Sequence, residues 1–367
     1  MKVLLISHYP PPSGGIASWT KRLLEIGLPN GWEIVHVNSN MIRGRDSYKN
    51  TKMSLRDELA RCFGIWGNGW KILKTDKERE IKVVHTCIPC KTLGMFREII
   101  TGIIAKIRGR KFILHCRCTV PNVVSSPGKR LVFKILAFLC DGIMVLNQKS
   151  YYFIKQVCGE KKIVGLIPNF VTENELCSVD ERTYSDSVHD VVYDGGVIAD
   201  KGCDLIIEAA ADLPDIIFHL IGNASEEMKN AKMPENVVLY GNRDKAFIKE
   251  MLLKCDAFLF LTRFWGEGFS NSLVEAMSAG LPCIVTDWAA NADMIGNDGG
   301  IVLEEGTAQA LKEAIGEIAG KDTRMAMGKR NIEKVKIEYI ESAIVPQYVE
   351  FYEKLLTITD MGQEGNT

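Results

Sequence analysis

Two glutamates flank the predicted start of a helix in the second half of the chain, and their spacing suggests ligand binding. Glu267 lies just before the helical pattern and Glu275 lies inside it, with Asn271 midway between them. Eight helical residues span about 12 Å, so one carboxylate could bind each end of an elongated ligand. Ser270 or Asn271 would cap this helix, whose first amide groups favour an anion. The pattern predicts a site for a ribose diol, a diphosphate and a hexose, which together make a sugar nucleotide.

A lysine in the stretch YDGGVIADKG, residues 193–202, suggests a second contact for an anion. Gly195 and Gly196 allow a sharp turn after a strand. Asp200 is expected to cap the next helix, with Lys201 in its first turn. A lysine at a helix start opposes the helix dipole, so this position favours a bound anion.

These residues, in this order, resemble the signature of the retaining glycosyltransferases of family 4. The run GEGFSNSLVEAMSAGLPCIVTDW at 266–288 is similar to members that build bacterial surface polysaccharides. The resemblance implies the GT-B architecture, in which two Rossmann-like domains face each other across a cleft. It implies a nucleotide diphosphate sugar as donor, with UDP favoured over GDP. It also implies that no cofactor and no metal is needed, and the sequence has no Asp-x-Asp motif.

The resemblance assigns a role to each matching position. Glu267 would orient the hexose and Glu275 would bind the ribose. Asn242 and Arg243 follow a predicted strand where family members bind the base. The leaving diphosphate would be stabilised by Lys201 and by the amide groups of Phe269, Ser270 and Asn271, and Gly268 beside them is also a donor-binding position.

One position departs from the family pattern. The family has an arginine directly after the first glycine of the lysine segment, and this chain has Gly196 there. Another cation is therefore expected to make the second phosphate contact. The sequence leaves the choice open among Arg117, Arg243 and Arg263.

The first half of the chain offers two weaker matches. Gly14 and Gly15 follow the first predicted strand and resemble the family's glycine pair near the donor phosphates. Because these glycines adjoin, they do not form the G-x-G-x-x-G motif of nicotinamide-binding folds. His115 and Arg117 lie at the end of another strand, and either could be the family's histidine near the reacting sugar. His115 and Lys201 join Glu267 as the candidate catalytic residues.

Charge is unevenly distributed along the 367 residues. Residues 1–167 contain 28 lysines and arginines against 11 acids, whereas residues 168–367 contain 17 against 35. A basic half predicts an anionic partner, such as a membrane surface or a lipid diphosphate. Basic and apolar residues alternate at 129–136, which suits a helix at a membrane surface. Nucleic acid is not expected, because no recognition motif or base-stacking pattern is present.

Apolar runs alternate with helical patterns through both halves, which predicts an α/β fold with two doubly wound parallel sheets. We expect an acceptor-side domain at 1–167, a nucleotide-sugar domain at 168–345, and a helix crossing back to the first domain, with a tail, at 346–367. Residues 41–80 read as irregular, with a helix around Leu55–Phe63. No apolar run is long enough to span a membrane.

The 11 cysteines, an odd number, suggest free thiols in a reducing cytoplasm. Cys87, Cys90, Cys116 and Cys118 lie near His85 and His115, so a metal site is thinkable. The spacing matches no zinc framework, and buried small apolar side chains are the favoured interpretation.

The sequence therefore predicts a retaining glycosyltransferase that moves a sugar from a nucleotide diphosphate sugar to a hydroxyl. The expected acceptor is a lipid-linked saccharide of capsule, O-antigen or exopolysaccharide synthesis, and the expected location is the cytoplasm, peripheral to the inner face of the membrane. Two alternatives stay open: a sugar-nucleotide epimerase of the same fold, and a non-catalytic protein that binds nucleotide or anionic lipid.

Overall fold

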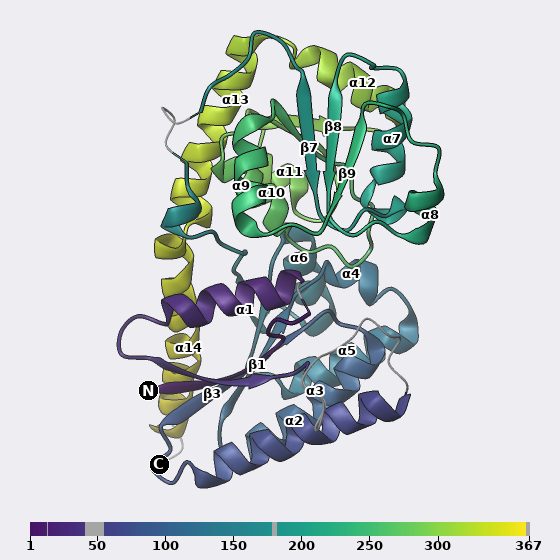
Figure 1. Cartoon of the computed structure of the whole chain (residues 1–367). Coiled ribbons are helices and arrows are strands. Elements are labelled where there is room, and N and C mark those ends of the chain that lie inside the picture. The colour runs from purple at the N-terminus through teal and green to yellow at the C-terminus, as the bar shows by residue number, and fades with distance from the viewer. Residues whose placement is uncertain (13, 41–54, 178–181, 365–367) are drawn as a thin grey trace. The chain divides into compact units, whose positions relative to one another are not determined.

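The computed structural model describes residues 1–12, 14–40, 55–177 and 182–364. The chain forms two compact units, the first made of Met1–Asn169 with Ser342–Thr367 and the second of Phe170–Glu341 (Figure 1). None of the helices in this part of the chain combines the length and apolar composition needed to cross a bilayer.

The first unit is built on a six-stranded parallel sheet, in the order β2-β1-β3-β4-β5-β6. Its strands are β1 (Lys2–Ser7), β2 (Glu33–Asn38), β3 (Ile81–Ile88), β4 (Lys111–Cys116), β5 (Gly142–Val145) and β6 (Ile163–Leu166). Its helices are α1 (Gly15–Ile26), α2 (Leu55–Thr75), α3 (Thr92–Ile107), α4 (Val120–Val123), α5 (Pro127–Leu139), α6 (Gln148–Cys158) and most of α14 (Glu341–Glu364). Helices α1 and α14 cover one face of the sheet, and α2, α3 and α5 cover the other (Figure 1).

The second unit repeats this plan with the order β12-β11-β10-β7-β8-β9. Its strands are β7 (Asp190–Asp194), β8 (Ile217–Ile221), β9 (Val237–Gly241), β10 (Ala257–Phe260), β11 (Cys283–Thr286) and β12 (Gly300–Leu303). Its α-helices are α7 (Cys203–Ala211), α8 (Glu226–Asn230), α9 (Lys245–Lys254), α10 (Asn271–Ser278), α11 (Asn291–Ile295), α12 (Ala308–Glu317) and α13 (Lys321–Lys334). Every strand pair in both sheets is parallel, which confirms the predicted fold class.

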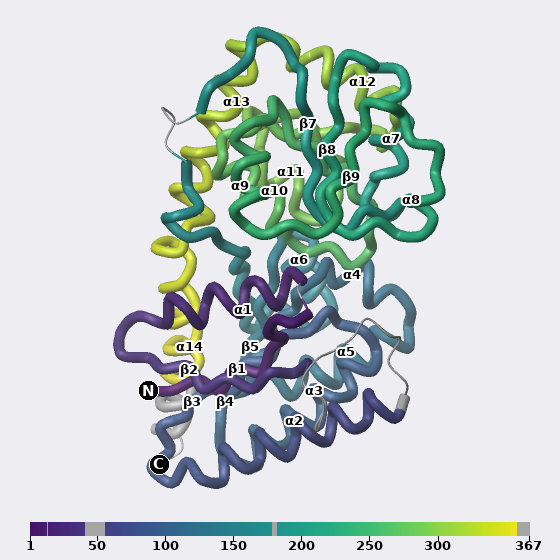
Figure 2. The backbone as a smooth tube through the Cα atoms, viewed as in Figure 1, coloured from purple at the N-terminus to yellow at the C-terminus, as the bar shows by residue number. Residues whose placement is uncertain are grey.

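The last helix of the chain packs into the first unit. Figure 2 shows α14 running beside α1, where the Trp19 indole donates a hydrogen bond of 3.0 Å to the Tyr348 hydroxyl. The Phe351 ring lies against Gly142 and Gly165, and a Cβ at either glycine would come within 2.8 Å of it. Two strands therefore lack side chains where α14 packs.

Helix α2 is longer than predicted. The sequence predicted irregular structure at 41–80, with a helix only around Leu55–Phe63. The glycines after Phe63 disfavour a helix locally. The helix continues to Thr75, with Ile65 and Leu73 buried against the sheet. The Trp66 indole also donates to the Arg97 carbonyl at 3.2 Å. Packing therefore outweighs the local cost of glycine, and the irregular stretch expected at 41–54 lies outside the described residues.

The helix that was expected to start after Asp200 starts later in the structure. Residues Ala199–Lys201 form a 3₁₀ turn, and α7 begins after Gly202 rather than after Asp200. Gly202 has φ 82°, and a Cβ there would lie 2.2 Å from the Leu261 carbonyl oxygen. Lys201 consequently precedes α7, on a turn that is packed directly against the end of β10.

Gly202→Ala tests this packing. We expect the free energy of unfolding to fall by about 1–3 kcal/mol, because the new methyl group forces both a left-handed conformation and a clash with backbone. Urea unfolding of the full chain would measure the change.

Gly316→Ala is the matched control. Gly316 lies on the exposed side of α12, and no atom lies within 4 Å of the position that an alanine methyl group would occupy. Alanine should therefore stabilise the helix by about 0.5–1 kcal/mol. Equal effects of the two substitutions would contradict the role given to Gly202.

Candidate active site

The second sheet changes its winding direction between β7 and β10. Strands β8 and β9 follow β7 on one side, whereas β10, β11 and β12 extend from the other side. In open parallel sheets, ligands bind at the carboxyl ends of the strands beside such a switch point. The two loops that meet there are 195–202 after β7 and 261–270 after β10. These are the loops in which the sequence placed Lys201 and Glu267.

Lys201 and Glu267 form an ion pair at this position. They are 66 residues apart in sequence, and their side chains are 21% and 12% exposed. The Lys201 ammonium also lies 5.5 Å from the Phe260 ring centroid and 5.3 Å from that of Phe264. The lysine is therefore held by a carboxylate and two aromatic rings at the mouth of the switch point.

The helix after β10 begins at the same edge of the sheet. Ser270 is the N-cap of α10, and its hydroxyl accepts a hydrogen bond of 3.2 Å from the Leu273 amide. Of the two residues that the sequence offered as caps, Ser270 fills the role. Gly266 has no room for a side chain, because a Cβ would lie 2.8 Å from the Phe264 ring. The amino end of α10 is thus fixed close to Glu267.

Glu275 has an ionic partner that the sequence did not suggest. Its side chain is 7% exposed and pairs with Lys245, which is 60% exposed. Lys245 is the first residue of α9, directly after the N-cap Asp244. The sequence does carry a signal for this partner, because Lys245, like Lys201, is a lysine at a predicted helix start.

Asp194 is a second residue that sequence reasoning missed. It ends β7 immediately before Gly195, and burial raises the pKa of its carboxyl to about 7. The Glu275 carboxylate raises the pKa further, and Lys245 opposes the shift. The sequence signal for Asp194 is its place between a buried strand and a pair of glycines, which puts its carboxyl at the carboxyl end of β7, beside the switch point.

The structure does not decide which arginine makes the second contact with the donor phosphates. Arg263 pairs with Asp204, Nη2 to Oδ2, at 2.6 Å, and Arg243 stacks on the Phe247 ring at 5.1 Å. Gly196 is exposed, and no atom lies within 4 Å of where its Cβ would be. Asn242, like Arg243, is exposed after β9. The identity of the second phosphate contact stays a prediction.

In the first unit, His115 and Arg117 belong to a buried chain of polar groups. The Arg117 guanidinium lies 4.3 Å from the Trp19 ring centroid, and its Nη1 is 3.3 Å from His115 Nε2. His115 Nδ1 is 3.2 Å from His85 Nε2, and His85 Nδ1 is 2.7 Å from the Tyr352 hydroxyl.

This chain determines the tautomers. A guanidinium only donates, so His115 Nε2 accepts from Arg117 and its Nδ1–H donates to His85. His85 then carries its proton on Nδ1 and donates to Tyr352. Burial lowers the pKa of His85 to about 3 and places that of His115 well below its usual value, with Arg117 adding to both shifts. Both rings are neutral near pH 7.

The histidines and cysteines expected near each other do cluster. His85, Cys87 and His115 offer three ligand atoms within 4.8 Å of one another. Both histidines are already hydrogen-bonded, and Arg117 brings a positive charge close to His115. Each of the 11 cysteines is a free thiol. Gly14 and Gly15 lie at the amino end of α1, where Gly14 is the N-cap.

Comparison with known proteins assigns the unit that carries the switch-point residues. Residues 187–334 match the family described as Glycosyl transferases group 1. The match covers most of the second unit, Phe170–Glu341. The site formed by Lys201 and Glu267 lies inside the matched range.

Two curated relatives of this chain carry glycan-related names. The chain is 30% identical over 131 residues to an N-acetyl-alpha-D-glucosaminyl L-malate synthase of Bacillus anthracis, covering 35% of this chain and 33% of the relative. It is 26% identical over 254 residues to an alpha-galactosylglucosyldiacylglycerol synthase of Streptococcus pneumoniae, covering 64% and 66%. The chain thus spans between about a third and two thirds of the length of these relatives.

Solved structures share the two-sheet fold. A sucrose-phosphate synthase of Thermosynechococcus elongatus superposes with a TM-score of 0.76 at 16% identity, covering 97% of this chain and 99% of that one. Anabaena Alr3699/HepE, in complex with UDP-glucose, superposes with a TM-score of 0.66 at 14% identity, covering 97% and 100%. These similarities support the GT-B, Rossmann-like architecture.

Asp194→Asn tests the electrostatics of the group 1 site. Between about pH 4 and pH 7 the native carboxyl keeps a proton that the unfolded chain has lost, so wild-type stability falls as the pH rises. The asparagine cannot ionise. We expect the variant to be more stable than wild type by about 2 kcal/mol at pH 8 and to lose this advantage near pH 4.

Urea unfolding at several pH values measures the effect. Asp212→Asn, at a surface aspartate with a 63% exposed side chain, is the control and should leave the pH dependence unchanged. Parallel curves for wild type and Asp194→Asn would contradict the raised pKa.

Proposed function

We propose that this protein is a retaining glycosyltransferase that moves a sugar from a nucleotide diphosphate sugar to a hydroxyl group. The donor would be a UDP-sugar, with a GDP-sugar as the second choice. The acceptor would be a lipid-linked saccharide used in bacterial surface polysaccharide synthesis, reached from the cytoplasmic side of the membrane. The observation that carries the proposal is the pairing of Lys201 with Glu267 at the switch point of the second unit.

The donor assignment rests on the ligand groups that could replace each partner of this ion pair. A diphosphate can replace Glu267 as the partner of Lys201, and a sugar hydroxyl can replace Lys201 as the partner of Glu267. The amino end of α10 adds amide groups and a favourable dipole for the phosphates. Glu275, on the same helix, would then accept hydrogen bonds from the ribose. The UDP-glucose complex of Alr3699/HepE is compatible with this donor class.

The proposed reaction breaks the bond between the anomeric carbon and the diphosphate oxygen. The acceptor oxygen forms the new bond on the same face of the sugar, and its proton passes to the departing phosphate. Negative charge therefore develops on the diphosphate, and a fixed cation at that place lowers the barrier. Lys201 would supply that cation from the protein itself, without a metal or other cofactor.

The acceptor assignment rests on the first unit and on one relative's name. The first unit carries the excess of lysine and arginine found in residues 1–167, which suits phosphate-bearing lipids. The Streptococcus pneumoniae relative is named for a diacylglycerol product. His115 and Arg117 belong to this unit and would act on the acceptor or sugar side.

Binding of UDP, GDP and ADP to the wild type and to Glu275→Ala tests the donor site. We expect tight binding of one diphosphate, which names the base. The substitution should weaken that binding by about 1–3 kcal/mol, because a charge-assisted hydrogen bond to the ribose is lost. Isothermal titration calorimetry is the measurement. Unchanged affinity in Glu275→Ala would overturn the ribose role, and absence of binding by wild type would overturn the donor site.

Replacement of Lys201 tests the chemistry. Lys201→Met should lower kcat by about 10²–10³-fold, as expected when a group that stabilises developing charge is removed. The readout is release of nucleotide diphosphate from the donor that binds, with a lipid-linked acceptor. Lys312→Met is a matched control, because Lys312 is 23% exposed and pairs with Asp212 on the surface.

Other outcomes would favour the alternatives. Conversion of the donor sugar without any acceptor would indicate an epimerase. Tight diphosphate binding with no turnover of any sugar nucleotide would indicate a non-catalytic binding protein.

A further inference from the structure

Two helices of the first unit expose apolar side chains in regular rows. On α3 the row follows the spacing 3, 4, 3, 4, and on α5 it follows the spacing 4, 3. The residues are Leu93, Phe96, Ile100, Ile103 and Ile107 on α3, and Leu131, Ile135 and Phe138 on α5. We call these eight residues the apolar face. Its two most exposed members, Phe138 at 88% and Ile107 at 66%, lie at the carboxyl ends of their helices.

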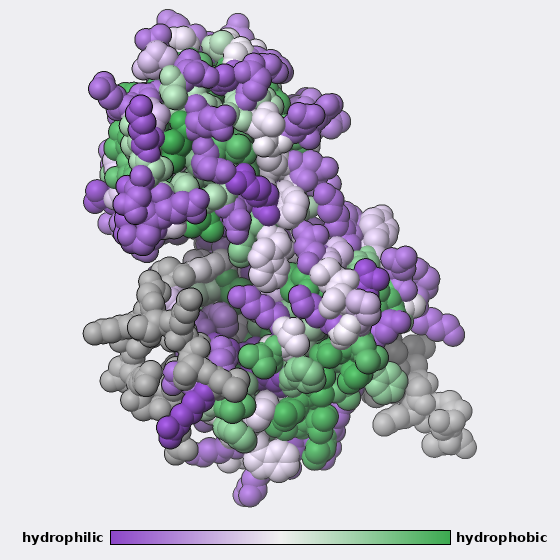
Figure 3. Space-filling model, turned by 90° about the vertical axis from the view of Figure 1, so that its right-hand side faces the viewer, coloured by the Kyte–Doolittle hydropathy of each residue, from purple (hydrophilic) through white to green (hydrophobic). Residues whose placement is uncertain are grey.

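The two rows form one surface, because α3 and α5 lie side by side on the same face of the sheet (Figure 1). Figure 3 shows apolar side chains gathered on the first unit in a patch rather than scattered singly. Isolated exposed apolar residues are normal on proteins, whereas a contiguous patch marks an interaction surface.

The charges on the two helices that carry the apolar face are almost all positive. Glu98 is the one acidic residue of α3, and it is buried in an ion pair with Arg97. Helix α5 has no acidic residue. The cations of the two helices, apart from Arg97, are Lys106, Lys129, Arg130 and Lys134. A surface of this composition complements an anionic partner that has an apolar interior.

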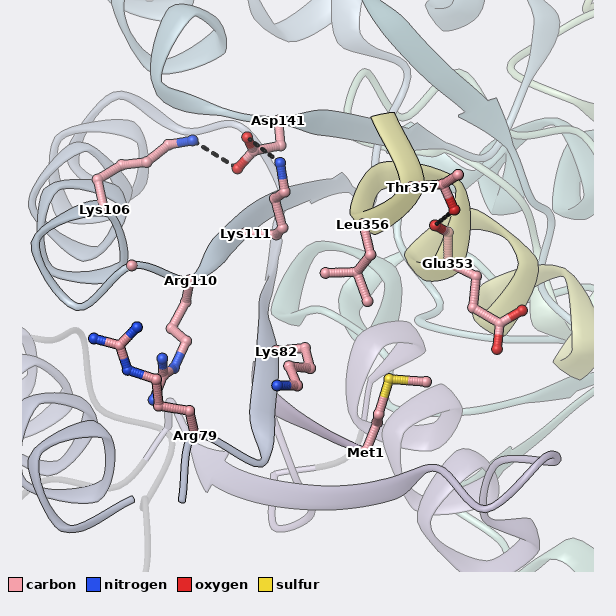
Figure 4. A pocket seen from close by; sticks show the side chains of 11 residues that line it. Met1, Arg79, Lys82, Lys106, Arg110, Lys111, Asp141, Glu353, Leu356 and Thr357 are labelled. Atoms are coloured by element: carbon pink, nitrogen blue, oxygen red, sulfur yellow. Dashed lines mark hydrogen bonds and ion pairs between the residues drawn. The ribbon is translucent and has the colours of Figure 1, made fainter. Parts of the chain in front are cut away.

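A cation-lined cavity adjoins the carboxyl end of α3. Its volume is about 790 Å³, and Lys106, the neighbour of Ile107, lines it. Figure 4 shows Lys106 and Lys111 turned toward Asp141, which they contact at 2.7 and 3.6 Å. Two carboxylates line the cavity, Asp141 and Glu353, against five cations, Arg79, Lys82, Lys106, Arg110 and Lys111. Arg110 is also paired with Asp76, at 2.8 Å, so three carboxylates in all face the five cations. The excess of cations suits the phosphate of a lipid headgroup.

We propose that the apolar face docks on an anionic phospholipid bilayer. Phe138 and Ile107 insert among the acyl chains, the cations of α3 and α5 meet the headgroups, and the cavity beside Lys106 binds headgroup phosphate. This inference rests on the proposed function, because it extends the proposal that the acceptor is linked to a lipid. The docking itself depends only on the first unit.

A bilayer fits this surface better than a second copy of the chain does. Two copies joined through the apolar face would bring the cations of α3 and α5 against those of the partner, with no exposed acid on either helix to neutralise them. Like charges placed together in an interface oppose association. An anionic bilayer instead offers apolar depth and negative charge together, which is how interfacial helices with basic and apolar residues bind membranes.

Flotation of the full-length protein with vesicles tests the docking. We expect the wild type to float with vesicles that contain phosphatidylglycerol, to float poorly with pure phosphatidylcholine, and to be released from the anionic vesicles as salt is raised to about 1 M. The double substitution Ile107→Ser and Phe138→Ser should reduce the bound fraction on anionic vesicles by about tenfold or more, because two inserted side chains are lost.

Ile337→Ser is the matched control. Ile337 is 73% exposed and lies in the second unit, outside the apolar face, so its substitution should leave flotation unchanged. The circular dichroism spectrum and the urea unfolding midpoint of the double variant should match those of the wild type, which shows that the variant is folded.

Three results would overturn the docking. These are equal flotation on neutral and anionic vesicles, flotation of the double variant equal to wild type, and a dimer in light scattering that the double substitution dissolves without changing lipid binding. The outcomes separate the two proposals, because a protein that floats yet binds no nucleotide diphosphate refutes the proposed donor site and leaves the docking intact.

Discussion

The ion pair between Lys201 and Glu267 is the constraint around which the site in the second unit is arranged. It joins the loop after β7 to the loop after β10 across the switch point of the sheet. Both side chains are mostly removed from water, so separating them without replacement partners would leave two poorly solvated charges. A ligand that enters here must therefore offer an anion to the lysine and a hydrogen-bond donor to the glutamate at the same time. A free phosphate meets one requirement and a free sugar meets the other. In our proposal, a sugar joined to a diphosphate meets both, so this pair itself contributes to selectivity.

The second pair, between Lys245 and Glu275, repeats this arrangement farther along α10. Asp194 adds a third carboxyl group close to Glu275, and its pKa of about 7 means that it holds a proton for much of the time near neutral pH. When Asp194 is protonated, the site has one negative charge fewer to repel a diphosphate. It can also donate a hydrogen bond, which a carboxylate cannot do. Two lysines then balance two carboxylates, and the amino end of α10 provides the remaining attraction for phosphate.

Much of this arrangement could be predicted from the sequence, because short apolar runs and regular helical spacing identify buried parallel strands and the helices between them. The motif around Glu267 also placed the important helix correctly. The predictions that failed were helix boundaries that depend on tertiary packing. Helix α2 extends beyond its predicted end, because the contact of Trp66 with Arg97 that supports it is not visible in the sequence. Asp200 looked like a cap, but the close approach of Gly202 to Leu261 decides where α7 begins.

The apolar face was missed for a different reason. Helix α3 is apolar on most of its circumference, and the sequence cannot say which part of such a helix faces the sheet. Met95 and Ala105 are buried, whereas Phe96 and Ile103 are exposed. Only the position of the sheet and of the neighbouring helices distinguishes these sets. For the same reason the basic pattern at 129–136 suggested a membrane helix but gave no indication that α3 would lie beside it.

The buried chain from Tyr352 to Arg117 bears on how the first unit could act on a sugar. His115 is neutral, and its Nε2 accepts a hydrogen bond from Arg117. In this tautomer the ring cannot donate to a sugar hydroxyl through Nε2, and any hydroxyl that donates to it must displace the guanidinium. Arg117 is therefore the group that must move first. Tyr352 lies on α14 and accepts a hydrogen bond from His85, which in turn accepts from His115, so the last helix helps to hold the orientation of both rings. In the proposed reaction α14 would therefore act through these hydrogen bonds rather than through contact with substrate.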